Sequence, residues 1–117
     1  MMKDVRQMLQ DTNYGVEALV GSNPEAWGNF SEFVGGALSD GALSAKTKEL
    51  IAVAISVYCR CEYCIVSHVY NALKVGCTRE EILESATAAT AFGGGPTMAY
   101  SSALLVAALD EFEKDFK

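Results

Sequence analysis

Three of the four cysteines and the single histidine of this chain fall within ten consecutive residues, Cys59 to His68, with the sequence CRCEYCIVSH. Cys61 and Cys64 form a C-x-x-C pair, and His68 follows Cys64 by four positions. If Cys61 opens a helix, these three side chains lie on one face of it. The positive end of a helix favours thiolate over thiol, and an imidazole one turn further along can accept a proton. Two thiols one turn apart also close readily into a disulfide, so the spacing predicts a redox-active dithiol.

Two other interpretations of this cluster stay open at this point. Cys59, Cys61, Cys64 and His68 are four potential zinc ligands, although structural zinc sites usually take ligand pairs from separated segments. The C-x-x-C pair could also be two buried thiols without chemistry, since free cysteine is often buried. A permanent disulfide staple is the weakest alternative, because cytoplasmic thiols are kept reduced unless they cycle. No bound cofactor is expected.

One acidic residue could belong to the same site. Glu49 precedes Cys61 by twelve positions, just before the most apolar part of the preceding helical segment. Taken alone, a glutamate in a helix usually lies on the solvated face. Packed against the cysteine helix, Glu49 could instead hydrogen-bond His68 and make it a better base. Both possibilities stay open from the residues alone.

The composition limits the size of the protein and predicts a partner. Its 117 residues suit a single domain, residues 1–117. Half of the residues are hydrophobic, and a chain of this length buries only about two-thirds of the surface that it exposes when unfolded. We therefore expect apolar surface to remain for a partner, and self-association is the simplest case.

Charge and hydropathy exclude several classes of partner. The net charge is −6 and the nine Lys and Arg residues are scattered, so the chain has no basic footprint for nucleic acid. Apolar runs such as residues 103–109 are far shorter than the roughly 20 residues of a membrane span. The first residues, MMKDVRQ, lack the apolar core of a signal peptide. The prediction is a cytoplasmic protein that binds neither nucleic acid nor membrane.

Helical patterns with recognisable ends cover most of the chain and would position the cysteine cluster. Asn23 before a proline, Ser44 and Thr78 are predicted N-caps, and Glu81 completes a capping box with Thr78. Gly76 suits the residue just after a helix end. Residues 3–19 form a further predicted helix. A β-strand is the alternative for residues 51–58, but the length of the segment favours a helix.

The C-terminal half has a glycine-rich break. Gly93, Gly94 and Gly95 interrupt the helix that follows Thr78, and Pro96 is predicted to begin a new one. The last helix would carry one apolar face that runs from Ser101 through Leu105 to Phe116. The fold class predicted from these patterns is all-α, a single-domain bundle of about five to six helices.

Several other side chains have two possible roles. The candidates for lining a pocket or a subunit interface are Trp27, Phe30, Phe92, Met98 and Tyr100. Ordinary core packing is the favoured prediction for all five. Cys59 and Cys77 are predicted to be small buried residues near helix ends.

With these residues identified, the chain resembles the alkylhydroperoxidase D-like and carboxymuconolactone decarboxylase superfamily. The resemblance rests on the spacing from Glu49 to Cys61-x-x-Cys64-x-x-x-His68 and on the glycine-rich break at residues 93–95. The helix start at residues 75–82, VGCTREEI, is similar as well. Together these features cover roughly residues 43–105. Alkylhydroperoxidase D has a histidine beside the second cysteine, where this chain has Tyr63.

The resemblance implies a helical fold that assembles into a homo-oligomer, a trimer or hexamer, and a thiol-dependent peroxidase activity. In that family the second cysteine attacks the hydroperoxide and the first resolves the sulfenic acid to a disulfide. Carried over, Cys64 is the peroxidatic thiol and Cys61 the resolving one, while Glu49 and His68 form the proton relay. The implied reductant is a dithiol, for example a lipoylated protein.

Other functions stay as alternatives. A dithiol that exchanges disulfides or senses oxidants, without peroxidase turnover, fits the same residues. Lactone decarboxylation is disfavoured because, within the superfamily, the decarboxylases do not rely on a C-x-x-C pair. A structural zinc protein is the remaining alternative.

Overall fold

The structure is a computed structural model that describes residues 4–117, and helices make up almost all of that range. The elements in order are α1 (Val5–Ser22), α2 (Pro24–Ala37), α3 (Ala45–Cys59), α4 (Glu62–Lys74), α5 (Arg79–Tyr100), a π-helical turn η1 (Ser101–Leu105), α6 (Val106–Phe112) and a 3₁₀ turn η2 (Glu113–Phe116). Residues 4–117 contain no strand. The all-α prediction is confirmed, and the strand alternative for residues 51–58 is wrong because α3 runs through them.

The helices begin where the local chemistry predicts. The side chains of Asn23, Ser44 and Thr78 each accept a backbone N–H from the first turn of the helix that follows. Glu81 completes the capping box, because its Oε1 accepts the Thr78 N–H at 2.8 Å. Gly76, just after α4, has a φ of 97°, a value that glycine adopts without strain.

The glycine-rich break is a kink at Gly94 that divides α5 into two helical stretches. Gly94 has φ 67° and ψ −148°, a region of backbone space that is almost confined to glycine. A Cβ atom at Gly93 would fall on the Thr97 side chain and lie 3.2 Å from the ring of Tyr58. This glycine therefore allows α5 to approach α3 closely. The predicted break and restart are confirmed, because the backbone is non-helical at Gly94 and Pro96 lies at the start of the helical stretch that follows.

Helices α3 to α6 form the core bundle, in which α3 packs most extensively against α5 and α4. The side chains of the core are nearly inaccessible to water, and burial of each large one contributes about 1.5–3 kcal/mol. They include Val53, Val57, Ile65, Val66, Val69, Ile82, Leu105, Ala108, Leu109 and Phe112. Tyr70 meets Phe112 edge to face, with ring centroids 5.3 Å apart.

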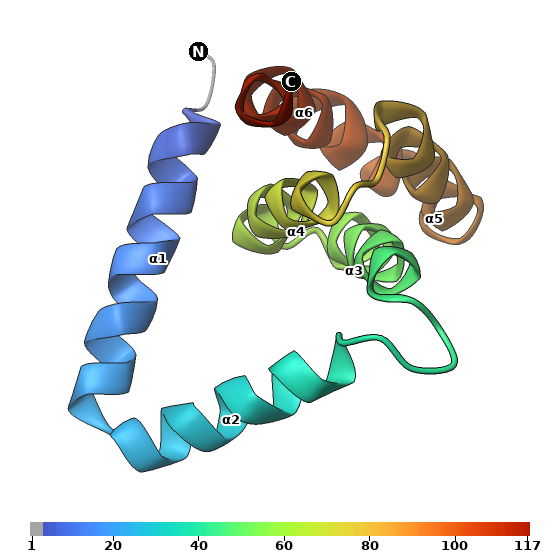
Figure 1. The fold of residues 1–117 in the computed structure, drawn as a ribbon. Coiled ribbons are helices and arrows are strands. Elements are labelled where there is room, and N and C mark those ends of the chain that lie inside the picture. Colours follow the sequence, from blue (N-terminus) through green and yellow to red (C-terminus); the bar gives the residue numbers. More distant parts are fainter. Residues whose placement is uncertain (1–3) are drawn as a thin grey trace.

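Helices α1 and α2 form an arm outside this bundle (Figure 1). The first turns of α1 are anchored to the bundle by buried Val5 and by Met8 and Leu9, which pack against the core. Arg6 also pairs with Glu111 at 2.8 Å and with Asp115 at 2.9 Å. The helix predicted for residues 3–19 is confirmed from Val5 and extends to Ser22, while Lys3 lies outside the described residues. Helix α2 packs mainly against α1 and has no buried residue.

The core prediction for four aromatic or sulfur-containing side chains is therefore wrong. Trp27 and Phe30 are exposed because α2 lies away from the bundle, and Phe92 and Met98 are exposed on either side of the glycine kink. Tyr100 does pack against the core, with part of its surface still accessible. Large apolar side chains of the arm and of the outer face of α3 thus remain in contact with solvent.

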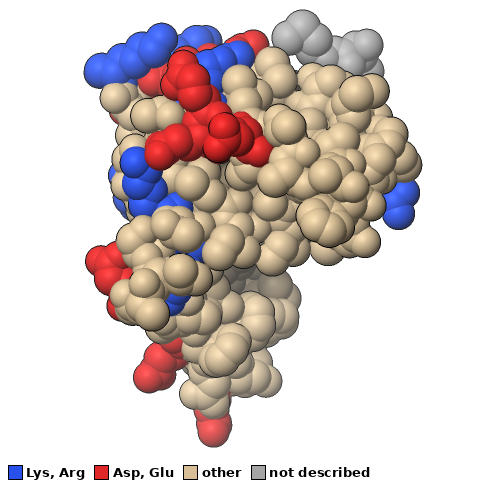
Figure 2. Space-filling view, turned by 90° about the vertical axis from the view of Figure 1, so that its right-hand side faces the viewer, with Lys and Arg blue, Asp and Glu red and all other residues tan. Residues whose placement is uncertain are grey.

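The arm also has an unusual charge pattern. Residues 7–43 contain no Lys, Arg or His, and their charged residues are Asp11, Glu17, Glu25, Glu32 and Asp40. Figure 2 shows a face on which charged side chains gather at the upper left, beside a broad area without charge. The projection below, at the height of α2 in Figure 1, carries acidic side chains. Among residues 4–117, no helix is both long enough and apolar enough to cross a bilayer.

The glycine kink gives a test of the fold. Gly94→Ala places a side chain at a positive φ, so we expect it to lower the free energy of unfolding by about 1–3 kcal/mol. Gly95→Ala is the matched control, because its φ is not positive and a Cβ there meets no atom within 4 Å. Urea denaturation measures both. Equal stability of the two variants would contradict the kink.

Candidate active site

The site is built on the turn that joins α3 to α4. After Cys59, the last residue of α3, Arg60 adopts a left-handed conformation with φ 58° and ψ 38°. The Arg60 N–H donates to the Val57 carbonyl at 3.3 Å, and the Cys61 N–H donates to the Ser56 carbonyl at 3.1 Å. This pair of bonds is a Schellman motif, in which glycine usually occupies the left-handed position. The sequence carries no signal for this turn, because glycine, and not arginine, usually marks the left-handed position.

The turn delivers Cys61 to the N-terminus of α4. Cys61 is the N-cap residue, with extended backbone angles, and Cys64 lies in the first turn of the helix. The two cysteines are joined by a disulfide, with their Cα atoms 5.2 Å apart. Both are partly buried, and the next two residues, Ile65 and Val66, anchor the helix in the core. The predicted C-x-x-C pair is therefore present at a helix start.

Glu49 and His68 form the second pair of the site, and His68 lies on the same helix as Cys64. Glu49 Oε1 and His68 Nδ1 are 2.9 Å apart, which links α3 to α4. The Glu49 side chain is only 8% exposed and that of His68 is 26% exposed. An ionised carboxylate can only accept a hydrogen bond, so Nδ1 donates and Nε2 is left to accept a proton. His68 follows Cys64 by one helical turn, which puts a potential base next to the dithiol.

The structure pairs Glu49 with His68 and Cys61 with Cys64, and it places Glu49 on the inside and not on a solvated face. Within residues 4–117, no three His, Cys, Asp or Glu side chains are grouped so that they could hold a metal ion. The prediction that Cys59 is buried is wrong, because the end of α3 leaves its thiol free and exposed.

Cys77 is the other free cysteine, and it is buried as predicted. Its Sγ lies 3.5 Å from the Lys46 carbonyl oxygen. Burial raises the pKa of the Cys77 thiol, Glu81 and Glu49 add to the rise, and Lys46 opposes it. A thiol in these surroundings stays protonated and unreactive near neutral pH.

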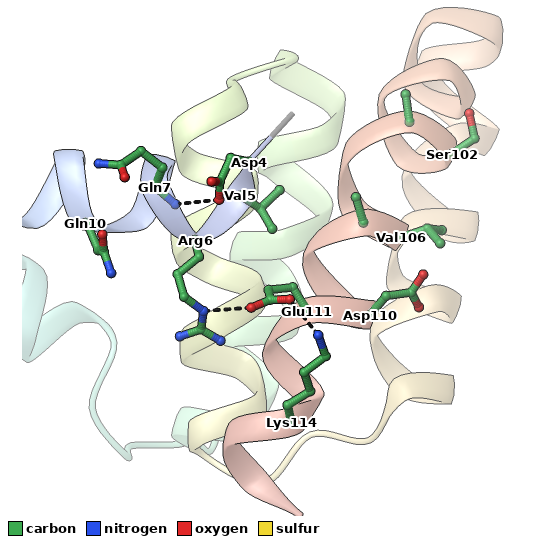
Figure 3. A pocket seen from close by; sticks show the side chains of 12 residues that line it. Asp4, Val5, Arg6, Gln7, Gln10, Ser102, Val106, Asp110, Glu111 and Lys114 are labelled. Atoms are coloured by element: carbon green, nitrogen blue, oxygen red, sulfur yellow. Dashed lines mark hydrogen bonds and ion pairs between the residues drawn. The ribbon is translucent and has the colours of Figure 1, made fainter. Parts of the chain in front are cut away.

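A hollow of about 890 Å³ lies elsewhere, between the start of α1 and the segment from η1 to η2. Figure 3 shows the side chains of Arg6 and Lys114 both reaching toward Glu111, which lines the hollow. Glu111 accepts hydrogen bonds from Lys114 at 2.9 Å and from Arg6 at 2.8 Å, and these two cations hold the pKa of Glu111 below its ordinary value. None of the four site residues lines this hollow, so its charges serve the attachment of α1.

Comparison with known proteins places these features in a family. The sequence model described as "Carboxymuconolactone decarboxylase family" matches residues 24–108. An uncharacterized protein of Cupriavidus necator is 36% identical over 105 residues, which are 90% of this chain and 93% of that protein. A second uncharacterized protein, from the cox locus of Paracoccus denitrificans, is 40% identical over 75 residues, 64% of this chain and 67% of that protein.

Solved structures agree in fold. A carboxymuconolactone decarboxylase family protein from Legionella pneumophila has a TM-score of 0.85 and 36% identity, over 97% of both chains. A member of the same family from Thermotoga maritima has a TM-score of 0.69 and 29% identity, over 74% of this chain and 89% of that one. The description of the Thermotoga protein includes a possible involvement in an antioxidative response.

The two free cysteines should differ sharply in reactivity. With the protein in its disulfide form at pH 7 to 8, we expect N-ethylmaleimide to label Cys59 quickly and Cys77 only after denaturation, because one thiol is exposed and the other is buried with a raised pKa. Mass spectrometry of the labelled peptides measures both rates. Rapid labelling of Cys77 in the folded protein would show that its burial is wrong.

Proposed function

This chain belongs to the carboxymuconolactone decarboxylase family, and we propose that it is a thiol-dependent peroxidase that reduces hydroperoxides through Cys61 and Cys64. One observation carries the proposal: the Glu49–His68 hydrogen bond lies one helical turn from a cysteine that is paired in a disulfide. A proton acceptor with its own orienting carboxylate is the arrangement that activates a thiol as a nucleophile. The antioxidative description of the Thermotoga relative supports the same class of reaction.

The reaction follows from this geometry in two steps. His68 takes the proton of the Cys64 thiol, and the thiolate attacks the terminal peroxide oxygen, so the O–O bond breaks. Cys64 becomes a sulfenic acid and the remaining alkoxide takes a proton to leave as an alcohol. The Cys61 thiol then attacks Cys64 Sγ, which forms the disulfide and releases water. Glu49 stabilises the imidazolium while His68 holds the proton.

A dithiol reductant completes the cycle. Two thiols of the donor exchange with the Cys61–Cys64 disulfide, which restores both cysteines and oxidises the donor. A lipoylated protein is the donor that the family resemblance implies. Such a cycle fits a reducing compartment, and the cytoplasm is the location that we propose.

The second candidate function is disulfide exchange or oxidant sensing without peroxidase turnover. Tyr63 favours it, because it stands beside Cys64 where alkylhydroperoxidase D carries a histidine, and it is exposed. A neutral phenol supplies no base at ordinary pH. The rate of reaction with peroxide separates the two functions.

We also propose that the protein is a homo-oligomer, a trimer or hexamer. The exposed apolar faces of α2 and α3 support this proposal, since Phe30, Phe33, Ile51 and Ile55 all lie in contact with solvent. Within each helix the two residues share one face, because they are three positions apart on α2 and four positions apart on α3. Exposed apolar patches mark interaction surfaces. The absence of Lys and Arg from residues 7–43 makes an anionic membrane surface a poor partner for the arm.

Peroxide titration tests the proposed activity. In the reduced protein, we expect hydrogen peroxide or an organic hydroperoxide to remove two thiols rapidly, while Cys61→Ser stops at a sulfenic acid on Cys64 and Cys64→Ser reacts slowly. His68→Gln should slow the reaction by about 10²-fold or more, and Glu49→Gln by less, because a general base is lost or weakened. Stopped-flow thiol assays and mass spectrometry follow each step.

Glu84→Gln is the matched control, because it removes the charge of an exposed glutamate on α5, and its rate should equal that of wild type. If wild type and all variants oxidise equally slowly, at the rate of an unactivated thiol, peroxide is not the substrate. The disulfide-exchange function would then be preferred.

Light scattering after gel filtration tests the oligomer. We expect a mass of three or six times 12.5 kDa for wild type, and a smaller mass for the double variant Phe30→Ser, Phe33→Ser, because the apolar face of α2 is interrupted. Val75→Ser, at another exposed apolar position, should leave the mass unchanged. A wild-type mass of 12.5 kDa at all concentrations would exclude the assembly.

A further inference from the structure

Cys59 is a third thiol at the redox junction, and nothing in the peroxidase cycle uses it. It is free and exposed, and it lies two residues before Cys61, on the other side of the left-handed Arg60. We propose that Cys59 exchanges with the Cys61–Cys64 disulfide, so that the disulfide moves outward to Cys59–Cys61 and Cys64 is released. This inference rests on the redox role proposed above for Cys61 and Cys64, but it does not require that peroxide is the oxidant.

The backbone of the turn places Cys59 and Cys61 within disulfide range. The Cα–Cα distance across one residue is set by the φ and ψ of that residue, and the values at Arg60, 58° and 38°, are those of a left-handed helix. By helical geometry, residues two apart then have Cα atoms about 5.4 Å from each other. Disulfides accept roughly 4.4–6.8 Å, and the existing Cys61–Cys64 pair spans 5.2 Å.

The unusual conformation of Arg60 matters for this distance. An extended residue at position 60 would separate the two Cα atoms by about 7 Å, beyond the range of a disulfide. The two hydrogen bonds of the Schellman turn, from the N–H groups of Arg60 and Cys61, hold the shorter distance. The left-handed conformation of Arg60 thus brings Cys59 close to the disulfide at Cys61.

The exchange is balanced without any further reagent. The Cys59 thiolate attacks Cys61 Sγ, a new Cys59–Cys61 bond forms, and the Cys61–Cys64 bond breaks with its electron pair on Cys64. No net oxidation takes place. The proton that Cys59 loses is available to the departing Cys64 thiolate. Cys64 is the leaving group on α4, one turn before His68, so the released thiol lies beside the base that the proposed reaction needs.

The exchange would also expose the disulfide. Cys61 and Cys64 are partly buried, whereas Cys59 is exposed at the end of α3. A donor dithiol must attack one sulfur of the disulfide directly, and access limits the rate. In the exchanged form the donor meets Cys59 at the surface, while Cys64 is already a free thiol.

Tryptic peptides report the position of the disulfide directly. Trypsin cleaves after Lys48, Arg60 and Lys74, so Cys59 falls in peptide 49–60 while Cys61 and Cys64 both fall in peptide 61–74. A Cys61–Cys64 disulfide leaves the two peptides separate. A Cys59–Cys61 disulfide links them, and Cys64 is then the free thiol in peptide 61–74.

The experiment uses the full chain with one disulfide, prepared with one equivalent of diamide so that no peroxide is involved. After incubation at pH 8, N-ethylmaleimide blocks all accessible free thiols, and the protein is denatured, digested without reduction and examined by mass spectrometry. We expect wild type to yield the linked peptides with N-ethylmaleimide on Cys64, together with the unlinked form. Cys59→Ser should yield neither the linked peptides nor labelled Cys64. Cys77→Ala, which removes the other free thiol, should behave as wild type does.

The proposal is overturned if wild type gives only separate peptides, with N-ethylmaleimide on Cys59 alone, at every incubation time. A linked pair that carries N-ethylmaleimide on Cys61 would overturn it too, because that product joins Cys59 to Cys64. The outcome is independent of the peroxide titration. If the disulfide exchanges but peroxide reacts slowly, the exchange proposal stands and the peroxidase proposal fails. If peroxide reacts rapidly but no exchange occurs, the peroxidase proposal stands and the exchange proposal fails.

Discussion

The hydrogen bond between Glu49 and His68 is the interaction on which the junction of α3 and α4 depends. A carboxylate removed from water is costly by several kcal/mol unless a partner meets it, and the Glu49 side chain is only 8% exposed. His68 supplies that partner across the helix interface at 2.9 Å. The same contact therefore aligns two core helices and orients an imidazole beside the cysteines. This one hydrogen bond serves both the packing of the helices and the chemistry of the site. A change to Glu49 or to His68 therefore affects both the packing and the chemistry.

Features with a local cause were predictable from the sequence, and those with a tertiary cause were not. The caps at Asn23, Ser44 and Thr78 follow from side-chain oxygens next to a helix start, and the kink follows from consecutive glycines. The exposure of Cys59 and of the α2 aromatic residues depends on where the helices lie, which no short pattern encodes. The burial of Glu49 was predictable only in part, because its spacing to His68 indicates a contact only if α3 packs on α4.

Arg60 shows how much can depend on one backbone angle. With glycine in its place, the same turn would form without strain. An arginine there costs about 1–3 kcal/mol, and the hydrogen bonds of Arg60 and Cys61 to α3 offset that cost. The direction of the chain into α4, and with it the position of the dithiol, is set at this residue. Side chains alone would not have indicated it.

The exposed arm has a consequence during synthesis of the protein on the ribosome. Residues 5–37 leave the ribosome before residues 45–112, which make up the bundle, and α2 finds no burial within its own chain even after the bundle has formed. Its aromatic side chains are thus open to the surroundings from the first seconds of synthesis, a state in which apolar segments are prone to aggregate. Residues 7–43 carry five acidic residues and no Lys, Arg or His, so charge repulsion keeps such nascent arms apart. Solubility during synthesis would then be a property of α1 and α2, separate from the chemistry of the bundle.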